Sequence, residues 1–318
     1  MKQAEQSVGW HVLWWLFGIG CIPVTFPWLL YHLYDTVRQN RRKARLAGKV
    51  VLITGASSGL GEALAHSFYK CGCRLILASR RREELERVKV ALINTHPTVP
   101  THPPVVLQLD ITNLNDVPLE VQKVLKIYPQ IDILINNAGI SYRGEVINTN
   151  VDIDIKVMLC NYFGQIALTK AVLPCMLERR SGHVVFVSSV QGRIAIPYRS
   201  AYAASKHALQ AWCDTTRAEL AEQNIKITVV SPGYVKTSLS LNAITGSGDT
   251  YGVMDKSTEE GFTPEYVAEQ VLKALLREAS EVTVATFVPK AAILLRSVLP
   301  SVYFWLMRKR AKTVAKDK

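Results

Sequence analysis

Residues 49–61 read Lys-Val-Val-Leu-Ile-Thr-Gly-Ala-Ser-Ser-Gly-Leu-Gly, a short apolar run that leads directly into three glycines spaced G-x-x-x-G-x-G. A brief apolar run bounded by a turn is typical of a buried strand, and a helical period begins at residue 61. Glycines allow the tight turn and a close approach of the backbone to a ligand. The stretch therefore predicts a strand, a turn and a helix whose free N–H groups bind a pyrophosphate. A purely structural glycine turn is the alternative.

The rest of the chain repeats this alternation of apolar runs and helical periods. Further strands are predicted at 75–78, 105–109, 131–135, 183–187 and 227–230, with helices at 61–70, 83–94, 115–127, 151–178 and 201–223. Short apolar strands that alternate with helices indicate a parallel sheet covered on both faces. We expect an α/β fold with a doubly wound parallel sheet, the Rossmann fold. The proline-rich residues 96–104 predict a surface loop and residues 238–262 a mobile loop, while Thr263-Pro264-Glu265 predicts the start of a helix that runs to about residue 277.

The formal net charge of +12 lies at the two ends of the 318-residue chain. Residues 1–49 hold seven basic and two acidic side chains, and residues 308–318 hold six and one, so each end carries +5. The body between them is nearly neutral, with 25 basic and 23 acidic groups. A nucleic-acid-binding domain carries its basic residues on the folded body. We therefore expect no nucleic-acid partner, and basic flanks beside a lipid bilayer instead.

Cysteine and histidine usage argues against disulfides and metals. Six cysteines are too sparse for a disulfide framework and form no CxxC pair, which predicts reduced structural thiols. Seven histidines form no HExxH motif, and zinc sites pair their ligands at characteristic spacings. We expect no metal site. A hydrophobic fraction of 48% excludes a disordered chain.

Residues 12–31 contain no charged side chain. Twenty helical residues span about 30 Å, the thickness of a bilayer's hydrocarbon core. Tryptophans and tyrosines lie at both ends of the run, as is typical of interfacial positions. The sequence predicts an N-terminal transmembrane helix. A buried soluble helix, and a monotopic or hairpin insertion caused by Pro23 and Pro27, are the alternatives; the lack of a small-x-small site disfavours a cleaved signal peptide.

Basic residues between positions 38 and 45 follow this segment, whereas Lys2 precedes it together with Glu5. The positive-inside rule places the body in the cytosol. We expect a single-pass protein of the endoplasmic reticulum, with the peroxisome as the alternative organelle. The expected parts are a membrane anchor at 1–36, a basic linker at 37–48, a dinucleotide-binding domain at 49–290, and an apolar, then basic, membrane-proximal tail at 291–318.

The end of the second strand bears on the choice of dinucleotide. It reads Ala78-Ser79-Arg80-Arg81-Arg82. An NAD site has a carboxylate here for the ribose 2′-hydroxyl, whereas Ser79 and Arg80 offer a hydroxyl and a cation that suit a 2′-phosphate. We predict NADP(H) in preference to NAD(H). The alternative is that these arginines only flank a helix start and pair with Glu83 and Glu84.

Five motifs in order resemble the short-chain dehydrogenase/reductase family over about residues 48–290. They are TGASSGLG at 54–61, Asp110 after the third strand, Asn136-Asn137-Ala138-Gly139 after the fourth, Ser189 with Tyr202-Ala-Ala-Ser-Lys206, and Pro232-Gly233 with Thr237. Within the family, NNAGISYRG, NYFG, RSAYAASKHA and SPGY, with the apolar N-terminus, resemble the membrane-associated member 7 group, its 7B type most closely. The resemblance implies an NAD(P)-dependent oxidoreductase that acts on CH–OH donors.

Sequence and resemblance together give a candidate cofactor site. Its residues are Thr54, Gly55, Ser57, Ser58, Gly59, Leu60, Gly61, Ser79, Arg80, Asp110, Ile111, Asn137, Ala138, Gly139, Tyr202, Lys206, Pro232, Gly233, Val235 and Thr237. The resemblance implies that Asp110 and Ile111 contact the adenine and that residues 232–237 hold the nicotinamide carboxamide.

The candidate catalytic residues are Ser189, Tyr202, Lys206 and Asn161. Tyr202 and Lys206 are four residues apart, so they share one helix face. An isolated tyrosine titrates near 10, and a lysine ammonium with an oxidised nicotinamide nearby lowers that pKa toward a useful value. Tyr202 can then exchange a proton with the substrate oxygen, while Ser189 donates a hydrogen bond to it. The resemblance implies that Lys206 also binds the nicotinamide ribose, and that Asn161 holds a water in a proton relay to Lys206.

The substrate is less well defined by the sequence. Candidate lining residues are Ser189, Tyr198, Tyr234 and Leu239. A membrane anchor favours lipophilic carbonyls or alcohols such as steroids, retinoids, fatty aldehydes or acyl-glycerone lipids. The apolar residues 291–307 are too short for a comfortable span and contain Arg296, so we expect a membrane-surface helix or a lid over the substrate, with a dimer or core contact as the alternative.

Two other function classes compete with an enzyme. A non-catalytic dinucleotide-binding scaffold at the membrane is disfavoured because Tyr202, Lys206 and the cofactor glycines are all present. A transporter or receptor is disfavoured because residues 12–31 carry no ionisable side chain apart from histidine at the flanks.

Overall fold

The computed structural model of the chain describes residues 25–30, 33–34, 38 and 41–316. It divides into two compact units, residues 1–45 and residues 46–318. In the first unit residues 25–30 are helical, with Phe26 and Trp28 exposed. Among the residues that the structure describes, no helix is both long and apolar enough to cross a bilayer. Of the membrane span predicted at 12–31, only residues 25–30 are described; the remainder lies outside the described residues, and the span stays a prediction.

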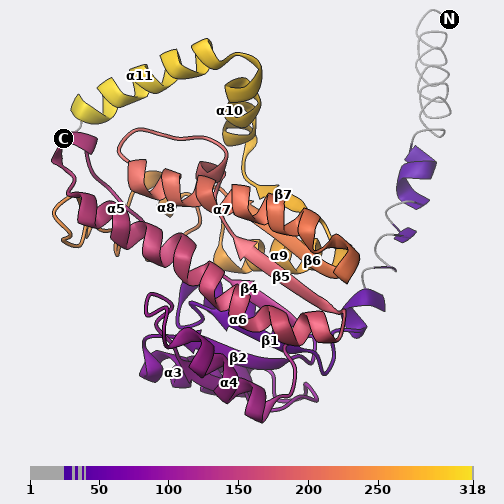
Figure 1. Cartoon of the computed structure of the whole chain (residues 1–318). Coiled ribbons are helices and arrows are strands. Elements are labelled where there is room, and N and C mark those ends of the chain that lie inside the picture. Colours follow the sequence, from indigo (N-terminus) through magenta and orange to yellow (C-terminus); the bar gives the residue numbers. More distant parts are fainter. Residues whose placement is uncertain (1–24, 31–32, 35–37, 39–40, 317–318) are drawn as a thin grey trace, which may run out of the picture. The chain divides into compact units, whose positions relative to one another are not determined.

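Seven parallel strands form a single sheet in the order β3-β2-β1-β4-β5-β6-β7 (Figure 1). The strands are β1 (Val50–Thr54), β2 (Arg74–Ser79), β3 (Val105–Gln108), β4 (Ile133–Asn136), β5 (Gly182–Val187), β6 (Ile225–Pro232) and β7 (Glu281–Val284). The chain winds outward from β1 in one direction and from β4 in the other, and Val51 of β1 pairs with both Leu75 and Ile133. The predicted doubly wound α/β sheet is confirmed, and its switch point between β1 and β4 is where such sheets bind ligands.

Helices cover both faces of the sheet. One face carries α2 (Gly59–Tyr69), α3 (Arg82–Thr95) and α9 (Pro264–Arg277), and the other carries α4 (Val117–Ile127), α6 (Gly164–Glu178) and α7 (Ser200–Glu219). Since successive strand residues point to opposite faces, Val51 and Ile53 pack with α2 while Val50 and Leu52 pack with α4 and α6. All four side chains are almost completely buried, and each stabilises the fold by about 2 kcal/mol.

The helix predicted at 151–178 contains an irregular turn. It consists of α5 (Val151–Met158), a π-helical turn η2 (Leu159–Phe163) and α6. Asn150 caps its start by accepting the N–H of Asp152 at 3.2 Å. Single π turns inside helices often occur at functional sites, and this one contains Asn161.

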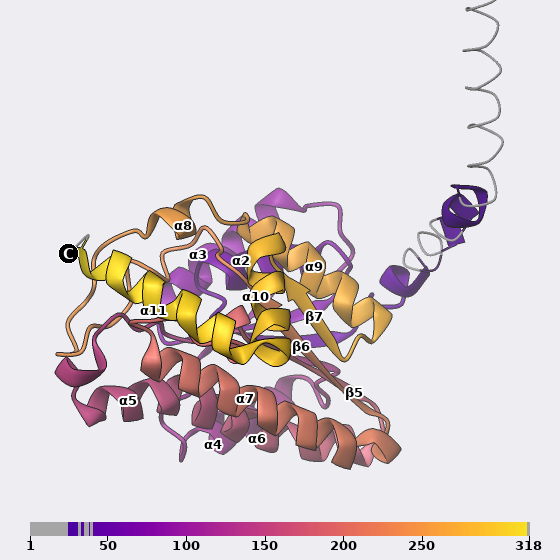
Figure 2. The ribbon, with the colours of Figure 1, turned by 90° about the horizontal axis from the view of Figure 1, so that it is seen from above.

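The C-terminal part of the body contains α9, a strand and two further helices. α9 begins as predicted, with the Thr263 hydroxyl accepting the N–H of Tyr266 and Pro264 in the first turn. The loop predicted at 238–262 contains one short helix, α8 (Lys256–Glu259). Beyond β7 follow α10 (Phe287–Val298) and α11 (Pro300–Lys316), which belong to the same compact unit as the sheet. Seen from above, α11 lies between α7 and α8 (Figure 2). Short 3₁₀ turns are η1 (Val146–Asn148), η3 (Val190–Gly192) and η4 (Ala221–Gln223).

Candidate active site

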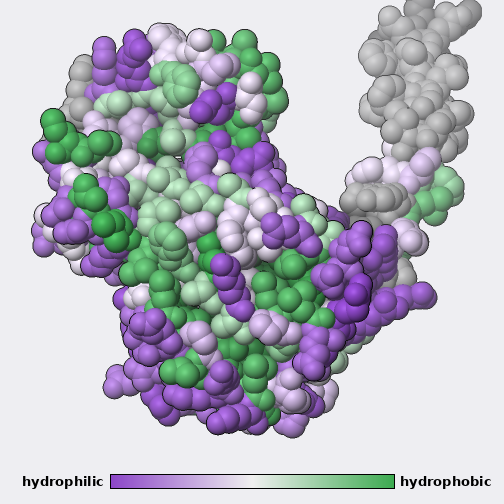
Figure 3. All heavy atoms as spheres, in the orientation of Figure 1, coloured by the Kyte–Doolittle hydropathy of each residue, from purple (hydrophilic) through white to green (hydrophobic). Residues whose placement is uncertain are grey.

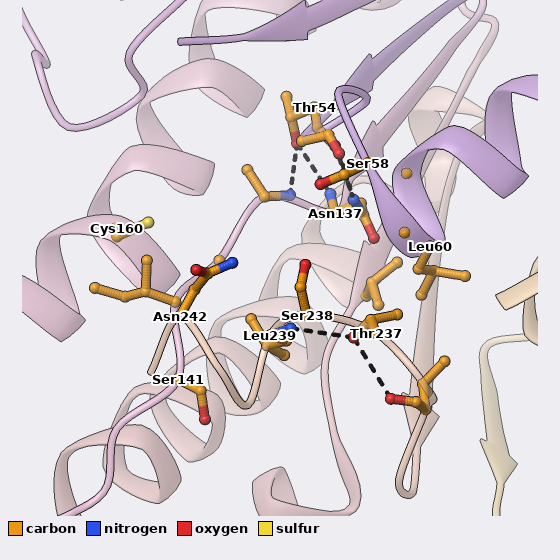
Figure 4. A pocket seen from close by; sticks show the side chains of 18 of the residues that line it. Thr54, Ser58, Leu60, Asn137, Ser141, Cys160, Thr237, Ser238, Leu239 and Asn242 are labelled. Carbon is orange, nitrogen blue, oxygen red and sulfur yellow. Dashed lines mark hydrogen bonds between the residues drawn. The ribbon is translucent and has the colours of Figure 1, made fainter. Parts of the chain in front are cut away.

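A cleft of about 530 Å³ lies at the carboxyl ends of the strands (Figure 4). Its walls come from the segments that follow β1 to β6, which a parallel sheet brings to one edge. All of the predicted cofactor-binding residues line this cleft, together with Ser189, Tyr234 and Leu239. Two predicted residues, Asn161 and Tyr198, are not among those that line it.

The turn between β1 and α2 leaves room for a ligand at the helix N-terminus. Gly55 has φ +65°, which favours glycine, and a side chain on Gly61 would place its Cβ 2.0 Å from the Gly55 carbonyl oxygen. The N-cap residue Ser58 makes no side-chain cap to α2. The first N–H groups of the helix therefore stay available to an anion such as a pyrophosphate.

Hydrogen bonds join this turn to the segment after β4. The Thr54 hydroxyl accepts the N–H groups of Asn137 and Ala138 at 2.9 and 3.0 Å, and Asn137 Nδ2 donates to the Thr54 carbonyl at 3.0 Å (Figure 4). Each of these polar groups thus has a protein partner. The network fixes the two sides of the switch point relative to each other.

At the end of β2 the structure brings a second arginine, Arg81, to the cleft beside the predicted Arg80. Arg81 Nη2 donates to both Ser57 Oγ and Ser58 Oγ at 2.9 Å, so its guanidinium lies across the glycine turn. Arg80 is exposed at the cleft, and Ser79 Oγ accepts the N–H of Arg81 at 3.1 Å. The alternative pairing with Glu84 is not found, because Glu84 pairs with Arg87 at 2.9 Å. Arg81 is a candidate that sequence reasoning missed, although the run of three arginines was its signal.

Ser189, Tyr202 and Lys206 meet at the inner end of the cleft. Ser189 follows β5 and precedes η3, while α7 carries Tyr202 and Lys206 one turn apart. They are 7%, 8% and 3% exposed, so water is largely excluded from all three. Lys206 Nζ lies 5.8 Å from the centre of the Tyr202 ring and donates to the Val187 carbonyl at 3.0 Å.

Burial has the largest effect on the ionisation of Tyr202 and Lys206. It raises the pKa of Tyr202, while a hydrogen bond with Ser189 and the charge of Arg143 act in the opposite direction. Burial also lowers the pKa of Lys206 to about 8. The sequence predicts a lowered pKa for Tyr202 from Lys206 and a nicotinamide together. In the structure, burial of the phenol has the largest effect on this pKa and acts in the opposite direction.

Asn161 lies behind the cleft wall and positions neighbouring backbone. Its Oδ1 accepts the Ile140 N–H at 2.8 Å, and its Nδ2 donates to the Ile140 carbonyl at 2.9 Å and to Ser205 Oγ at 3.1 Å. Ser205 in turn donates to the Tyr202 carbonyl at 2.8 Å. The side chain therefore ties the segment after β4 to the helix that bears Tyr202, and the predicted water relay stays a prediction.

A buried charge cluster joins the 238–262 loop to the body. Asp255 Oδ2 accepts from Arg143 Nη2 at 2.6 Å and Nε at 3.0 Å, from Ser240 Oγ at 3.0 Å, and lies 3.4 Å from Arg199 Nη2. Arg143 also donates to Ser141 Oγ. Burial lowers the pKa of Arg199 to about 10. No sequence signal identified this cluster, because Arg143 and Asp255 are 112 residues apart.

The C-terminal helix α11 contacts two predicted substrate residues. Tyr198 has φ +63°, an uncommon value for a tyrosine, and its hydroxyl donates to the Ala311 carbonyl at 3.2 Å. Arg310 Nη2 donates to the hydroxyl of Tyr234 at 3.2 Å. Tyr303 is 1% exposed and donates to the Ala195 carbonyl. α11 thus packs against the segment between Ser189 and Tyr202.

The cleft fits a dinucleotide. Gly55, Gly59 and Gly61 line the cleft without side chains, so backbone there can approach a pyrophosphate closely. The buried atoms Ser188 Oγ and Gln191 Oε1 in the cleft wall have no hydrogen-bond partner among the described residues. Such atoms normally have a partner, and a bound ligand can supply one. Within the described part of the chain, no cluster of histidine, cysteine or carboxylate side chains could hold a metal ion.

Comparisons with known proteins agree with this geometry. Residues 49–246 match a family model described as short chain dehydrogenase. A dehydrogenase/reductase SDR family protein 7-like from Anopheles gambiae is 54% identical over 309 residues, 97% of each chain, and a dehydrogenase/reductase SDR family member 7B from Xenopus laevis is 48% identical over 299 residues, 92% of this chain and 93% of that one.

Solved structures give the same picture. A short-chain dehydrogenase from Streptomyces avermitilis is 28% identical with a TM-score of 0.67 and covers 84% of this chain and 99% of its own. An alcohol dehydrogenase from Thermococcus sibiricus, complexed with 5-hydroxy-NADP, is 25% identical with a TM-score of 0.62 and covers 75% of this chain and 95% of its own.

Proposed function

Because the chain belongs to the short-chain dehydrogenase/reductase family, and is therefore an NAD(P)-dependent oxidoreductase, we propose that it interconverts a lipophilic carbonyl and its alcohol with NADP(H). The observation that carries the proposal is the convergence of Ser189, Tyr202 and Lys206 on one cleft with the glycine turn. When bound, the dinucleotide supplies or accepts the hydride. The rest of the chemistry belongs to side chains of this chain.

Tyr202 is proposed as the proton donor in reduction. Its phenol is buried beside the Ser189 hydroxyl, and burial keeps it protonated at neutral pH. A carbonyl oxygen placed against both groups accepts two hydrogen bonds, which strengthen as negative charge develops on that oxygen. Tyr202 then gives up its proton, and in the oxidative direction it takes one from the alcohol.

Lys206 is proposed to hold the ribose and to favour the ionised form of Tyr202. Its ammonium lies 5.8 Å from the centre of the Tyr202 ring, and a nearby positive charge favours the ionised phenol. Because burial lowers the pKa of Lys206 to about 8, the charge that assists Tyr202 is lost as the pH rises through that value in the free chain. Asn161 is proposed to support this pair through Ser205.

Preference for NADP(H) over NAD(H) rests on the cations at the end of β2. Arg80 is exposed at the cleft and Arg81 crosses the glycine turn, so we propose that a 2′-phosphate there meets two guanidinium groups. The Thermococcus alcohol dehydrogenase is complexed with a ligand of the same class, 5-hydroxy-NADP. If an Arg80→Glu, Arg81→Glu double variant keeps its preference for NADPH, this assignment is wrong.

A membrane location is proposed from the sequence. The uncharged residues 12–31 and the basic residues after them favour a single-pass anchor with the catalytic body in the cytosol, in the endoplasmic reticulum or the peroxisome. That location brings the cleft near lipophilic substrates such as steroids, retinoids, fatty aldehydes or acyl-glycerone lipids. We propose a homodimer as an alternative assembly.

The experiment that tests the function is NADPH oxidation by the detergent-purified full-length chain across a panel of lipophilic carbonyls. The Tyr202→Phe variant serves as the matched control, since it removes a single oxygen. Turnover of at least one carbonyl by the parent and not by the variant supports the proposal. Binding of NADPH without turnover on any member of the panel favours the scaffold instead.

A further inference from the structure

α10 and α11 expose a set of large apolar side chains on the body of the protein. The set, here called the outer face, comprises Phe287, Val288, Leu294, Val298, Leu299, Val302, Phe304, Trp305 and Leu306. Phe287 is 82% exposed and Trp305 is 50% exposed. Green side chains gather over α10 at the upper right of the body, with purple ones interspersed along α11 (Figure 3). Large exposed apolar patches that are rimmed by polar residues mark interaction sites on protein surfaces.

The outer face is distinct from the side of α11 that packs on the body. Tyr303 is buried, and Met307 and Ala311 are half-buried; their spacing of four residues places them on one helix face. Val302 and Leu306 are likewise four residues apart, and both are exposed. α11 is therefore apolar on two sides, and the body covers one of them.

Charge indicates which partner covers the other side. Residues 287–316 contain seven basic residues and no acidic one: Lys290, Arg296, Arg308, Lys309, Arg310, Lys312 and Lys316. No ion pair among the described residues includes any of them. Lys309 Nζ lies 3.7 Å from the centre of the Trp305 ring, and the Arg296 guanidinium lies 4.9 Å from that of Phe304. Aromatic rings with cations beside them are typical of the lipid headgroup region.

We propose that the outer face of α10 and α11 docks on an anionic bilayer surface and thereby holds the rim of the catalytic cleft at the lipid. A helix with an apolar face and a basic polar side binds in the interface plane rather than across it. The opposite side of α11 contacts Tyr234, which lines the cleft, and the segment between Ser189 and Tyr202. Docking therefore places the substrate entrance against the source of lipophilic substrates. Docking itself needs no catalytic role, whereas the placement of the substrate entrance rests on the proposed function.

Hydroxyl-radical footprinting of the full-length chain tests the proposal. The protein is reconstituted at one chain per nanodisc, in phosphatidylcholine with about 30% phosphatidylserine, a strongly anionic composition. The controls within the molecule are Phe163 on the π turn and Tyr266 on α9, which are 48% and 44% exposed. After each oxidation rate is normalised to the intrinsic reactivity of its side chain, we expect the rates of Phe304 and Trp305 to fall several-fold below those of the controls. Normalised rates that follow exposure in all four residues overturn the proposal.

Two further arms separate lipid from a second copy of the chain. Protection that appears only in discs loaded with two chains identifies a dimer and overturns the proposal. One cation at an anionic surface strengthens binding roughly fivefold, so Lys309→Glu is expected to weaken docking by about thirtyfold and restore oxidation of Trp305. The matched control is Lys123→Glu on α4, which lies at the opposite end of the body (Figure 1). This variant is expected to leave Trp305 protected from oxidation. If Trp305 is equally protected in the two variants, the partner is not an anionic surface and the proposal is overturned.

Discussion

Replacing Asp255 with asparagine tests how the 238–262 loop is held on the body. The carboxylate accepts from Arg143 at 2.6 and 3.0 Å and lies 3.4 Å from Arg199, whose side chain is 14% exposed. Asparagine keeps the size of the side chain and one acceptor oxygen. It leaves two mostly buried guanidinium groups without a counter-charge.

The magnitude follows from these distances. A carboxylate 3.0 Å from a guanidinium nitrogen, at an effective dielectric constant of about 20, gains roughly 5.5 kcal/mol. The asparagine oxygen and entering water recover part of this, and removing one partner of a buried pair typically costs about 3–5 kcal/mol. Since Asp255 keeps 19% exposure, we expect the lower end, about 3 kcal/mol. The population of the open loop then rises roughly a hundredfold.

Hydrogen-exchange mass spectrometry of residues 240–260 at pH 7 measures this change. The matched control is Asp249→Asn in the same loop, where the carboxylate accepts a hydrogen bond from the exposed Ser247 hydroxyl. Amides such as that of Gly252, which donates to the Leu241 carbonyl at 3.0 Å, are expected to exchange about a hundredfold faster in Asp255→Asn alone. Equal exchange rates in the two variants would refute the reasoning.

The pH dependence gives a second check on the same variant. Burial acts to raise the pKa of Asp255, but the hydrogen bond and charge of Arg143 outweigh it and hold that pKa below its usual value. The contribution to loop closure is therefore present above about pH 3.9 and is lost as the pH falls through the lower folded-state value. The difference between parent and variant should shrink to zero in acid.

Four other substitutions, one with a matched control, test separate parts of the structure. Tyr202→Phe should lower turnover by about 10²–10⁴-fold while NADPH affinity, followed by fluorescence titration, changes little. Arg81→Gln should weaken NADPH binding about tenfold and spare NADH, whereas Arg82→Gln should alter neither. Burial lowers the pKa of His183 to about 4, so stability falls as the pH drops below the unfolded value of about 6.5. His183→Gln, compared with the parent by urea unfolding at about pH 7 and about pH 4.5, should remove about 2 kcal/mol of that loss. Gly61→Ala should abolish nucleotide binding in calorimetry, because its Cβ meets the Gly55 carbonyl at 2.0 Å.

Local patterns in the sequence were sufficient to predict most of the sheet. Six of its strands are continuous apolar runs, since both faces of a parallel sheet are buried. The seventh strand, Glu281–Val284, was not predicted because it lies at the edge of the sheet, pairs with β6 alone and alternates polar with apolar residues. The helix predicted at 151–178 is correct in extent, but periodicity alone does not reveal the π turn within it.

The residues of the candidate site were likewise only partly predictable from the sequence. Residues that follow strands were predictable, because parallel strands bring their carboxyl ends to one edge of the sheet. Arg81 was missed because its contacts with Ser57 and Ser58 depend on the path of the chain after β2. The pairing of Arg143 with Asp255 depends on how the loop folds back over the cleft, which no local pattern encodes.

The π turn at Leu159–Phe163 has a consequence for the way this protein can change over time. One residue more or less in a helix rotates everything beyond it by about 100°. Deleting a residue here to restore an ordinary helix would turn Leu168, Val172 and Met176 off the sheet, where all three are fully buried. Retaining the turn instead keeps Asn161 on Ile140. Insertions and deletions should therefore be accepted in the loops around the cleft long before they are accepted in this helix.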